Sequence, residues 1–152
     1  LDFRRQRQMC IRDSSCILPE VGKPTFELEN DEIEIGMGIH GEPGIKREKL
    51  RKADLLVDDL CKIIFEDFEL SNSDKVSIMI NSLGATPLEE LYIVSKKVNE
   101  IFSKKNIEIV KSYVGRYATS LEMAGMSISV LSLDNDLKKA LLDHSECPFW
   151  IN

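Results

Sequence analysis

The stretch KVSIMINSLGATPLEELYIVSKKVNEIFSKKNIEIVKSYVG, residues 75–115, decides the fold. Its first six residues, KVSIMI, are mostly apolar and typical of a buried strand, and the polar loop NSLGATP follows. Pro87 then begins a predicted helix that runs to about Ser103, with Thr86 placed to cap it. The closing IEIVKSYVG is a second predicted strand. A strand, a helix and a strand in this order predict a sheet with a helix packed against it.

The segments on either side extend this sheet. Upstream, TFELE alternates apolar and acidic residues and EIEIGMGI follows an Asn-Asp turn, so residues 25–39 predict a hairpin. Apolar residues at three- and four-residue steps then predict a helix over 46–68. Downstream, GMSISVLSL predicts a strand, and DNDLKKALL predicts a short helix capped by Asp134 or Asn135.

The predicted order of elements is β-β-α-β-α-β-β-α. A hairpin and a direct strand-to-strand step cannot be parallel crossovers, because those need longer connections. The sequence therefore predicts an α/β (α+β) fold, a two-layer mixed β-sheet with helices on one face, in a single domain. In the tail HSECPFWIN, we expect Phe149 and Trp150 to hold the chain against that domain.

The first stretch, Leu1 to about Ser14, differs from the rest. It is basic, contains four arginines and has no sustained period. LDFRRQRQMCIRDS resembles the peptide obtained when sequencing-adapter DNA is translated at the end of a truncated read. We therefore expect residues 1–14 to be non-native or disordered and to add nothing to the fold, with residues 15–152 as the domain. The alternative is a native basic tail that binds an acidic partner.

The composition excludes several classes of function. A net charge of −6 and the lack of a dense Lys/Arg cluster argue against nucleic acid as a partner. No apolar run approaches the roughly 18 residues that cross a bilayer, and the N-terminus lacks the apolar core of a signal peptide. We expect no membrane association and a cytoplasmic location. No CxxC pair occurs, Cys61 fits a buried thiol, and His40, His144 and Cys147 lack zinc-type spacing, so no metal is assigned.

Three loops rich in glycine and small polar residues are candidates for chemistry. His40 follows a predicted strand in GIHGEPG, where the glycines beside it would let a ligand approach closely. A neutral imidazole nitrogen is a nucleophile toward a carbonyl carbon, although a histidine in a turn also serves as a surface or hydrogen-bonded structural residue. Residues 81–87 and 117–125 fit either ligand binding, at a helix N-terminus or through hydroxyls, or plain turns and caps.

These loops also carry a family resemblance. GMGIHGEPGI at 36–45, NSLGATPLEELY at 81–92 and GRYATSLEMAGMSISVLSLD at 115–134 resemble the C-terminal half of the dihydroxyacetone-binding subunit of dihydroxyacetone kinase, DhaK type. The resemblance runs from Cys16 to about Trp150, and GIHGEPG is its most specific element. The chain departs from it at position 82, where serine stands in place of the asparagine expected in the family.

The resemblance implies a covalent role for His40. In the family, the histidine of this motif attacks the ketone carbon of dihydroxyacetone and holds it as a hemiaminal. That bond selects short carbonyl compounds over glycerol and aims a terminal hydroxyl at the phosphoryl donor. The resemblance further implies that this chain carries no cofactor, that ADP is bound by a partner subunit which donates the phosphoryl group, and that the subunit is a homodimer.

The family subunit is about twice as long as this chain, and the difference is enough residues for a second domain. In the family, that N-terminal domain supplies the general base. We therefore expect a fragment of a kinase subunit, inactive when alone. The end at Asn152, soon after the last helix, favours the stand-alone form that depends on the phosphoenolpyruvate phosphotransferase system over ATP-dependent fused forms. One alternative is a paralogue that senses the ketone as a coactivator of a transcription regulator. Another is a structural domain in which His40 is buried and hydrogen-bonded.

Overall fold

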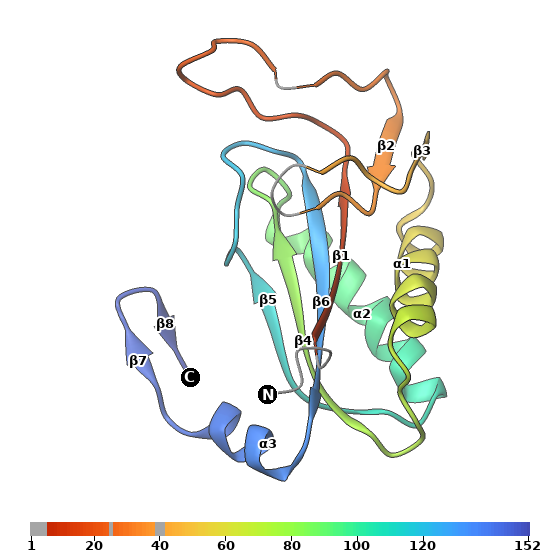
Figure 1. Ribbon diagram of the computed structural model, residues 1–152, viewed down its shortest axis with the longest axis vertical. Helices are drawn as coiled ribbons and strands as arrows, with labels where there is room; N and C mark the ends of the chain where they lie inside the picture. Colours follow the sequence, from red (N-terminus) through yellow and green to blue (C-terminus); the bar gives the residue numbers. More distant parts are fainter. Residues whose placement is uncertain (1–5, 25, 39–41) are drawn as a thin grey trace.

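A six-stranded mixed sheet with two helices against one face forms the body of the protein (Figure 1). The computed structural model describes residues 6–24, 26–38 and 42–152. The strands of this sheet are β1 (Gln6–Arg12), β2 (Glu32–Ile35), β3 (Lys46–Lys49), β4 (Lys75–Ser82), β5 (Glu108–Gly115) and β6 (Gly125–Leu133). The remaining elements are α1 (Ala53–Asp67), α2 (Leu88–Lys104), α3 (Asn135–Leu142) and a small hairpin of β7 (Glu146–Cys147) and β8 (Trp150–Ile151).

The strands lie in the order β3-β2-β1-β6-β4-β5. Only one neighbouring pair is parallel, β4 with β5, and α2 is the crossover that joins them. The other pairs in this order are antiparallel. The predicted mixed sheet with a helical layer on one face is therefore confirmed.

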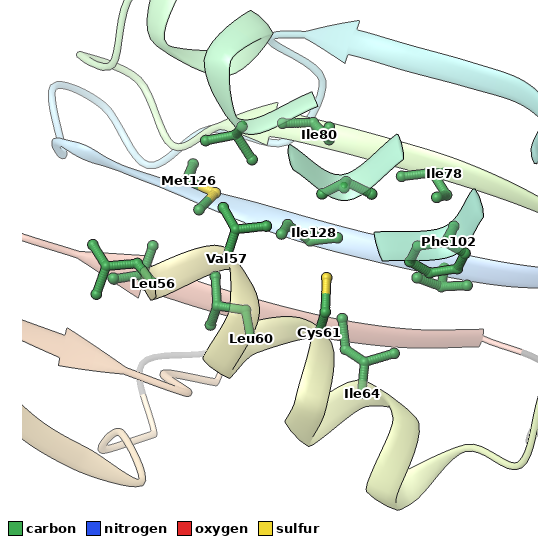
Figure 2. Packing of buried hydrophobic residues seen from close by; sticks show 14 of the residues in the cluster. Leu56, Val57, Leu60, Cys61, Ile64, Ile78, Ile80, Phe102, Met126 and Ile128 are labelled. Atoms are coloured by element: carbon green, nitrogen blue, oxygen red, sulfur yellow. The ribbon is translucent and has the colours of Figure 1, made fainter. Parts of the chain in front are cut away.

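The core lies between the sheet and the helices α1 and α2. Val57, Leu60 and Ile64 of α1 follow one another at three- and four-residue steps and are buried. Ile78 and Ile128 project from β4 and β6 toward the same space, as Figure 2 shows. Burial of each such side chain contributes roughly 1.5–3 kcal/mol to folding. This layer fixes the sheet on which the loops are mounted.

The opposite face of the sheet carries the C-terminal tail. The Trp150 ring of β8 lies with its centroid 4.7 Å from that of Tyr113 on β5, and the Tyr113 hydroxyl donates a hydrogen bond to Asn152 Oδ1 at 3.0 Å. Trp150 therefore holds the tail as expected. Phe149 does not, because it is 94% exposed.

The N-terminal strand corrects one expectation. Gln6–Arg12 form β1, which pairs with β6 from Gln6↔Leu131 to Arg12↔Gly125 and separates β6 from β2. In Figure 1 this strand, in red, runs beside blue β6 in the middle of the sheet. Met9 and Ile11 pack against the core. The basic stretch that we expected to add nothing to the fold therefore contains the alternation of buried side chains that is typical of a strand. The non-native origin of residues 1–14 remains a prediction.

The predicted hairpin over residues 25–39 is wrong in its pairing. β2 pairs with β1 on one side and with β3 on the other, and no strand is found over the described residues 26–30. Lys46–Lys49, predicted as the first turn of a helix, is this edge strand β3, and α1 begins only at Ala53. Leu50, an apolar residue within the predicted helix 46–68, is 53% exposed. The charges of KREK suit an exposed sheet edge, where they discourage pairing with another chain.

The remaining predicted elements are confirmed within a few residues. α2 begins after Pro87 and runs to Lys104, and β5, β6 and α3 lie where their patterns place them. Asp134 caps α3, because its carboxylate accepts a hydrogen bond from the Leu137 N–H at 2.8 Å. Among the described residues, no helix is long and apolar enough to cross a membrane.

Candidate functional site

The three loops singled out in the sequence meet at one end of the sheet. β1, β4 and β5 end there, whereas β2 and β6 begin there, because both run antiparallel to β1. The loop that follows the four-residue strand β2 lines the same cavity as the other two loops. A cavity of about 560 Å³ opens between the loops. The first loop contributes Gly38 and Pro43, the second Leu83, and the third Ala118, Thr119 and Ser120. The sequence did not place these loops relative to one another, since that depends on strand direction.

His40, the predicted nucleophile, belongs to residues 39–41 and lies outside the described residues. The residues on either side of this segment are described. The Gly38 N–H donates a hydrogen bond to the Glu42 carbonyl oxygen at 3.1 Å, so the two flanks lie side by side. Further along, the Ile45 N–H donates to the Ile35 carbonyl at 2.7 Å and begins the ladder between β2 and β3. Residues next to the predicted nucleophile thus line the cavity.

A buried carboxylate anchors the first loop. Glu34 is 3% exposed, and its Oε1 accepts a hydrogen bond from the Gly44 N–H at 2.8 Å. Its Oε2 accepts one from Arg12 Nε, also at 2.8 Å. A Cβ at Gly44 would lie 2.5 Å from Glu34 Cγ and 2.7 Å from the Ile35 carbonyl oxygen, so only glycine fits there.

The charge of Glu34 is stabilised by these contacts. Burial alone would raise the pKa of this carboxyl, but the hydrogen bonds from Gly44 and Arg12, with the charge of Arg47 nearby, outweigh it and lower the pKa. Glu34 is therefore an ionised anchor of the loop.

The second and third loops interlock through their backbones. The Leu83 N–H donates to the Gly125 carbonyl at 3.0 Å, and the Ser120 N–H donates to the Leu83 carbonyl at 2.6 Å. Gly84 adopts a φ of +151°, and a Cβ there would clash with the carbonyl oxygen of Leu121. The two loops therefore act as one wall of the cavity.

Thr86 binds the first residue of β6 and does not cap α2 as predicted. Its hydroxyl donates to the Gly125 carbonyl at 2.7 Å and accepts from the Gly125 N–H at 2.8 Å. Pro87 precedes α2 in an extended conformation, without a capping hydrogen bond from its side chain.

Asn81, at the end of β4, holds the third loop. Its Oδ1 accepts hydrogen bonds from the N–H groups of Tyr117 and Ala118 at 2.7 and 3.0 Å. Its Nδ2 donates to the Ala118 carbonyl at 2.7 Å and to Ser127 Oγ at 3.3 Å. The side-chain amide is 2% exposed and uses both its donors and its acceptor.

The rest of the cavity is partly apolar. Cys16, Leu83 and Met123 form a small buried cluster against which Phe26 and Met37 pack. The Cys16 sulfur lies 3.6 Å from Ser120 Oγ. Burial raises the pKa of the neighbouring Cys10 thiol, so this group stays protonated rather than acting as a thiolate. A small polar molecule in the cavity would meet hydroxyls, the charged side chains of Arg12 and Glu34, and an apolar patch.

The remaining polar side chains of the third loop and the tail have structural contacts. Glu122 Oε1 accepts a hydrogen bond from the Ile17 N–H at 2.6 Å, so this carboxylate ties the third loop to the segment after β1. His144 is exposed, with Nδ1 3.1 Å from the Asn152 carbonyl oxygen. Within the described part of the chain, no three His, Cys, Asp or Glu side chains are grouped as metal ligands. The Cys61 thiol is buried in the core as predicted.

Sequence reasoning missed Glu34 and the role of Asn81. Glu34 lies within the alternating EIEI, where it reads as a solvent-facing residue of a half-buried strand. Asn81 ends an apolar run and is indistinguishable from a turn residue. A polar residue at the loop end of a strand was the available signal in both cases, but its partners come from distant parts of the chain.

Comparison with known proteins identifies the family. Residues 3–149 match the model of the Dak1 domain. Two relatives from Listeria innocua are dihydroxyacetone-binding subunits DhaK of PTS-dependent dihydroxyacetone kinases. The subunit of kinase 1 is 46% identical to this chain, over 81% of this chain and 37% of the subunit. The subunit of kinase 2 is 42% identical, over 90% of this chain and 41% of the subunit. This chain thus spans about two-fifths of the length of the relatives it matches.

A solved structure agrees with this fold. The dihydroxyacetone kinase operon co-activator DhaQ superposes with a TM-score of 0.81 at 25% identity, over 91% of this chain and 43% of its own. Sequence and structure therefore agree, and this chain belongs to the Dak1 domain family.

Proposed function

We propose that this chain is the C-terminal part of a dihydroxyacetone-binding subunit and that His40 holds dihydroxyacetone as a covalent hemiaminal. The observation that carries the proposal is the position of Gly38 and Pro43. These residues bracket the segment with His40 and both line the cavity of about 560 Å³. Two relatives named for dihydroxyacetone binding are 42% and 46% identical to this chain, which supports the same ligand class.

The proposed bond forms without a leaving group. The lone pair of one imidazole nitrogen of His40 attacks the carbonyl carbon, and the π electrons of the C=O bond move to oxygen. That oxygen takes up a proton, and the ring releases the proton on its other nitrogen, so both end neutral. The mass of the chain rises by one whole ketone molecule. Glycerol has no electrophilic carbon and cannot form this bond.

The cavity offers suitable surroundings for a small ketose. Thr119 and Ser120 line the same cavity as Gly38 and Pro43, and their hydroxyls can exchange hydrogen bonds with the two hydroxyls of dihydroxyacetone. Cys16 and Met37 make a dry side for its carbons. Positioning by one covalent bond and several hydrogen bonds would aim one hydroxyl at a phosphoryl donor.

The remaining parts of the reaction belong to other proteins or segments. We propose that a partner subunit carrying ADP delivers the phosphoryl group, which derives from the phosphoenolpyruvate phosphotransferase system. The hydroxyl oxygen of the ketose would gain the phosphoryl group while its proton passes to a general base in another domain of the subunit. We further propose a homodimer in the cytoplasm.

A second candidate is ketone sensing without phosphorylation. It is favoured by the close superposition on the co-activator DhaQ, with a TM-score of 0.81. The higher identity to the two kinase subunits favours the enzyme. The two functions differ in turnover: a full-length kinase subunit would phosphorylate dihydroxyacetone with the phosphotransferase components and fail with ATP alone. Vigorous turnover with ATP alone would contradict the proposed donor.

The covalent step can be tested on this chain directly. With dihydroxyacetone labelled by ¹³C at the carbonyl, the ketone resonance should give way to that of a tetrahedral carbon bonded to oxygen and nitrogen. The His40→Ala variant should lose this signal. The His144→Ala variant, which changes an exposed histidine, should keep it. An adduct that survives His40→Ala would refute the assignment of the nucleophile.

A further inference from the structure

We infer that Asn81 is a positioning residue for the ligand cavity, holding the hydroxyl-bearing wall of the third loop through its side-chain amide. The inference rests on the proposed function, because it concerns how the same cavity recognises the hydroxyls of a ketose. Asn81 itself is absent from the cavity lining, so it acts through the loop rather than on the ligand.

The geometry of the amide fits this role. Three of its four hydrogen bonds, at 2.7, 2.7 and 3.0 Å, go to the backbone of Tyr117 and Ala118. The fourth, at 3.3 Å, goes to Ser127 on the neighbouring strand β6. One buried side chain therefore ties the loop to the middle of the sheet. Buried donors and acceptors that lose their hydrogen-bond partner cost free energy.

In the part of the loop that Asn81 holds, Tyr117 packs its ring against Trp150, with 5.4 Å between the ring centroids, but the cavity-lining residues next to it have less support. Tyr117, Ala118 and Thr119 are all exposed, and Thr119 and Ala118 face the cavity together with Ser120. An exposed loop keeps a fixed shape only if its backbone is bound to something rigid. β4, paired on both sides by β5 and β6, is that rigid element. The position of the Thr119 hydroxyl therefore depends on Asn81, whereas the Ser120 backbone is also held by the Leu83 carbonyl, to which its N–H donates at 2.6 Å.

Asn81→Asp is the sharpest test, because it preserves the shape of the side chain. It replaces the Nδ2 donor by an oxygen that would face the Ala118 carbonyl at the present 2.7 Å separation. Attraction becomes repulsion, so the loop should move away from β4. Asn99→Asp is the matched control. Asn99 lies on α2, outside the cavity, and its Nδ2 also donates to a backbone carbonyl, that of Ser95, at 2.8 Å.

The experiment compares two ketones on the 152-residue chain. Dihydroxyacetone has two hydroxyls and hydroxyacetone has one, while the carbonyl is the same. Adduct formation is titrated by the ¹³C signal of each labelled ketone. Asn81→Asp should weaken dihydroxyacetone binding about tenfold or more, the loss expected when a buried hydrogen bond is removed. Hydroxyacetone binding should weaken much less, and Asn99→Asp should change neither.

The preference between two ketones separates positioning from general destabilisation. A variant that is merely less stable but folded would keep the ratio of the two affinities. If the unsubstituted chain forms no adduct, the proposed function fails and this inference with it. If it forms one and Asn81→Asp keeps both affinities, only the inference on Asn81 fails.

A second variant guards against misfolding. If circular dichroism shows that Asn81→Asp is unfolded, Asn81→Ser replaces it, since the uncharged short hydroxyl cannot bridge to both Tyr117 and Ala118. It should show the same loss of preference for dihydroxyacetone. Unfolding of both variants would overturn the inference, because Asn81 would then be required for the fold as a whole.

Discussion

The carboxylate of Glu34 accepts a hydrogen bond from the backbone N–H of Gly44 at 2.8 Å, which fixes the base of the loop between β2 and β3. Glu34→Ala should lower the free energy of unfolding by about 1–3 kcal/mol, because it leaves the buried Arg12 guanidinium and the half-buried Gly44 N–H without their acceptor. Glu34→Gln retains an acceptor oxygen and should lose less. Urea denaturation of the two variants measures the difference. Equal stability of Glu34→Ala and the unsubstituted chain would show that the loop does not depend on this bond.

The same carboxylate should make stability depend on pH. The pKa of Glu34 is lowered in the folded chain, so its contribution is fully present above the pKa of the unfolded state, about 4.3. The contribution is lost as the pH falls through the lower pKa of the folded state. The urea midpoint should therefore fall on acidification below about pH 4. Glu34→Gln should show a smaller fall over this range, and an identical fall would rule out Glu34 as its source.

Gly84→Ala should separate the second and third loops. An added methyl would clash with the Leu121 carbonyl oxygen, so the wall of the cavity must shift. Gly22→Ala is a suitable control: Gly22 also has a positive φ, +63°, but nothing lies within 4 Å of an added Cβ. Both variants should lose about 1–2 kcal/mol from backbone strain. Only Gly84→Ala should also weaken adduct formation, and equal adduct formation by both would contradict the close approach.

The cysteines should differ in reactivity. Burial, with a smaller effect of Asp58, raises the pKa of Cys61 to about 12, and the side chain is almost inaccessible. Cys147 is exposed. Iodoacetamide at about pH 8 should alkylate Cys147 in the folded chain and Cys61 only in urea. Peptide mass mapping measures both sites. Rapid labelling of Cys61 without denaturant would mean that α1 opens locally.

The origin of residues 1–14 can be read from DNA. We predict that the source genome encodes different residues immediately upstream of Ser15. Because the segment at Gln6–Arg12 lies between β2 and β6, the replacing residues should alternate, with apolar side chains at the positions of Met9 and Ile11. The original stretch found in the genome, preceded by a start codon, would refute this prediction.

Local patterns predicted the middle and the end of the fold well. β4, α2, β5, β6 and α3 have boundaries that follow from periodicity, from Pro87 and from the Asp134 cap. β4, α2 and β5 pack on neighbours close in sequence, so local signals and tertiary contacts agree there. The first third was predicted poorly. β3 forms through its pairing with β2, which begins where the Ile45 N–H donates to the Ile35 carbonyl. No local pattern in KREK indicates a strand.

The site was predicted in its parts but not in its assembly. The sequence singled out the three loops because glycines and small polar residues are visible in a single chain. It missed the side chains that bind them together. Glu34 contacts Gly44 across a hairpin, and Asn81 contacts Tyr117 across a crossover, so both depend on strand pairing. Polar anchors of this type become recognisable only when the strand order is known.

The central position of β1 has a consequence for how the protein folds. β4, α2 and β5 can associate early, since they are adjacent in sequence, whereas Gln6 must wait for Leu131 before β1 can pair. The β2-β3 hairpin joins the other strands only through β1. During synthesis, the β2-β3 hairpin is therefore made early but can join the sheet only after the ribosome has completed β6. The ligand cavity is assembled by the last long-range closure of the chain.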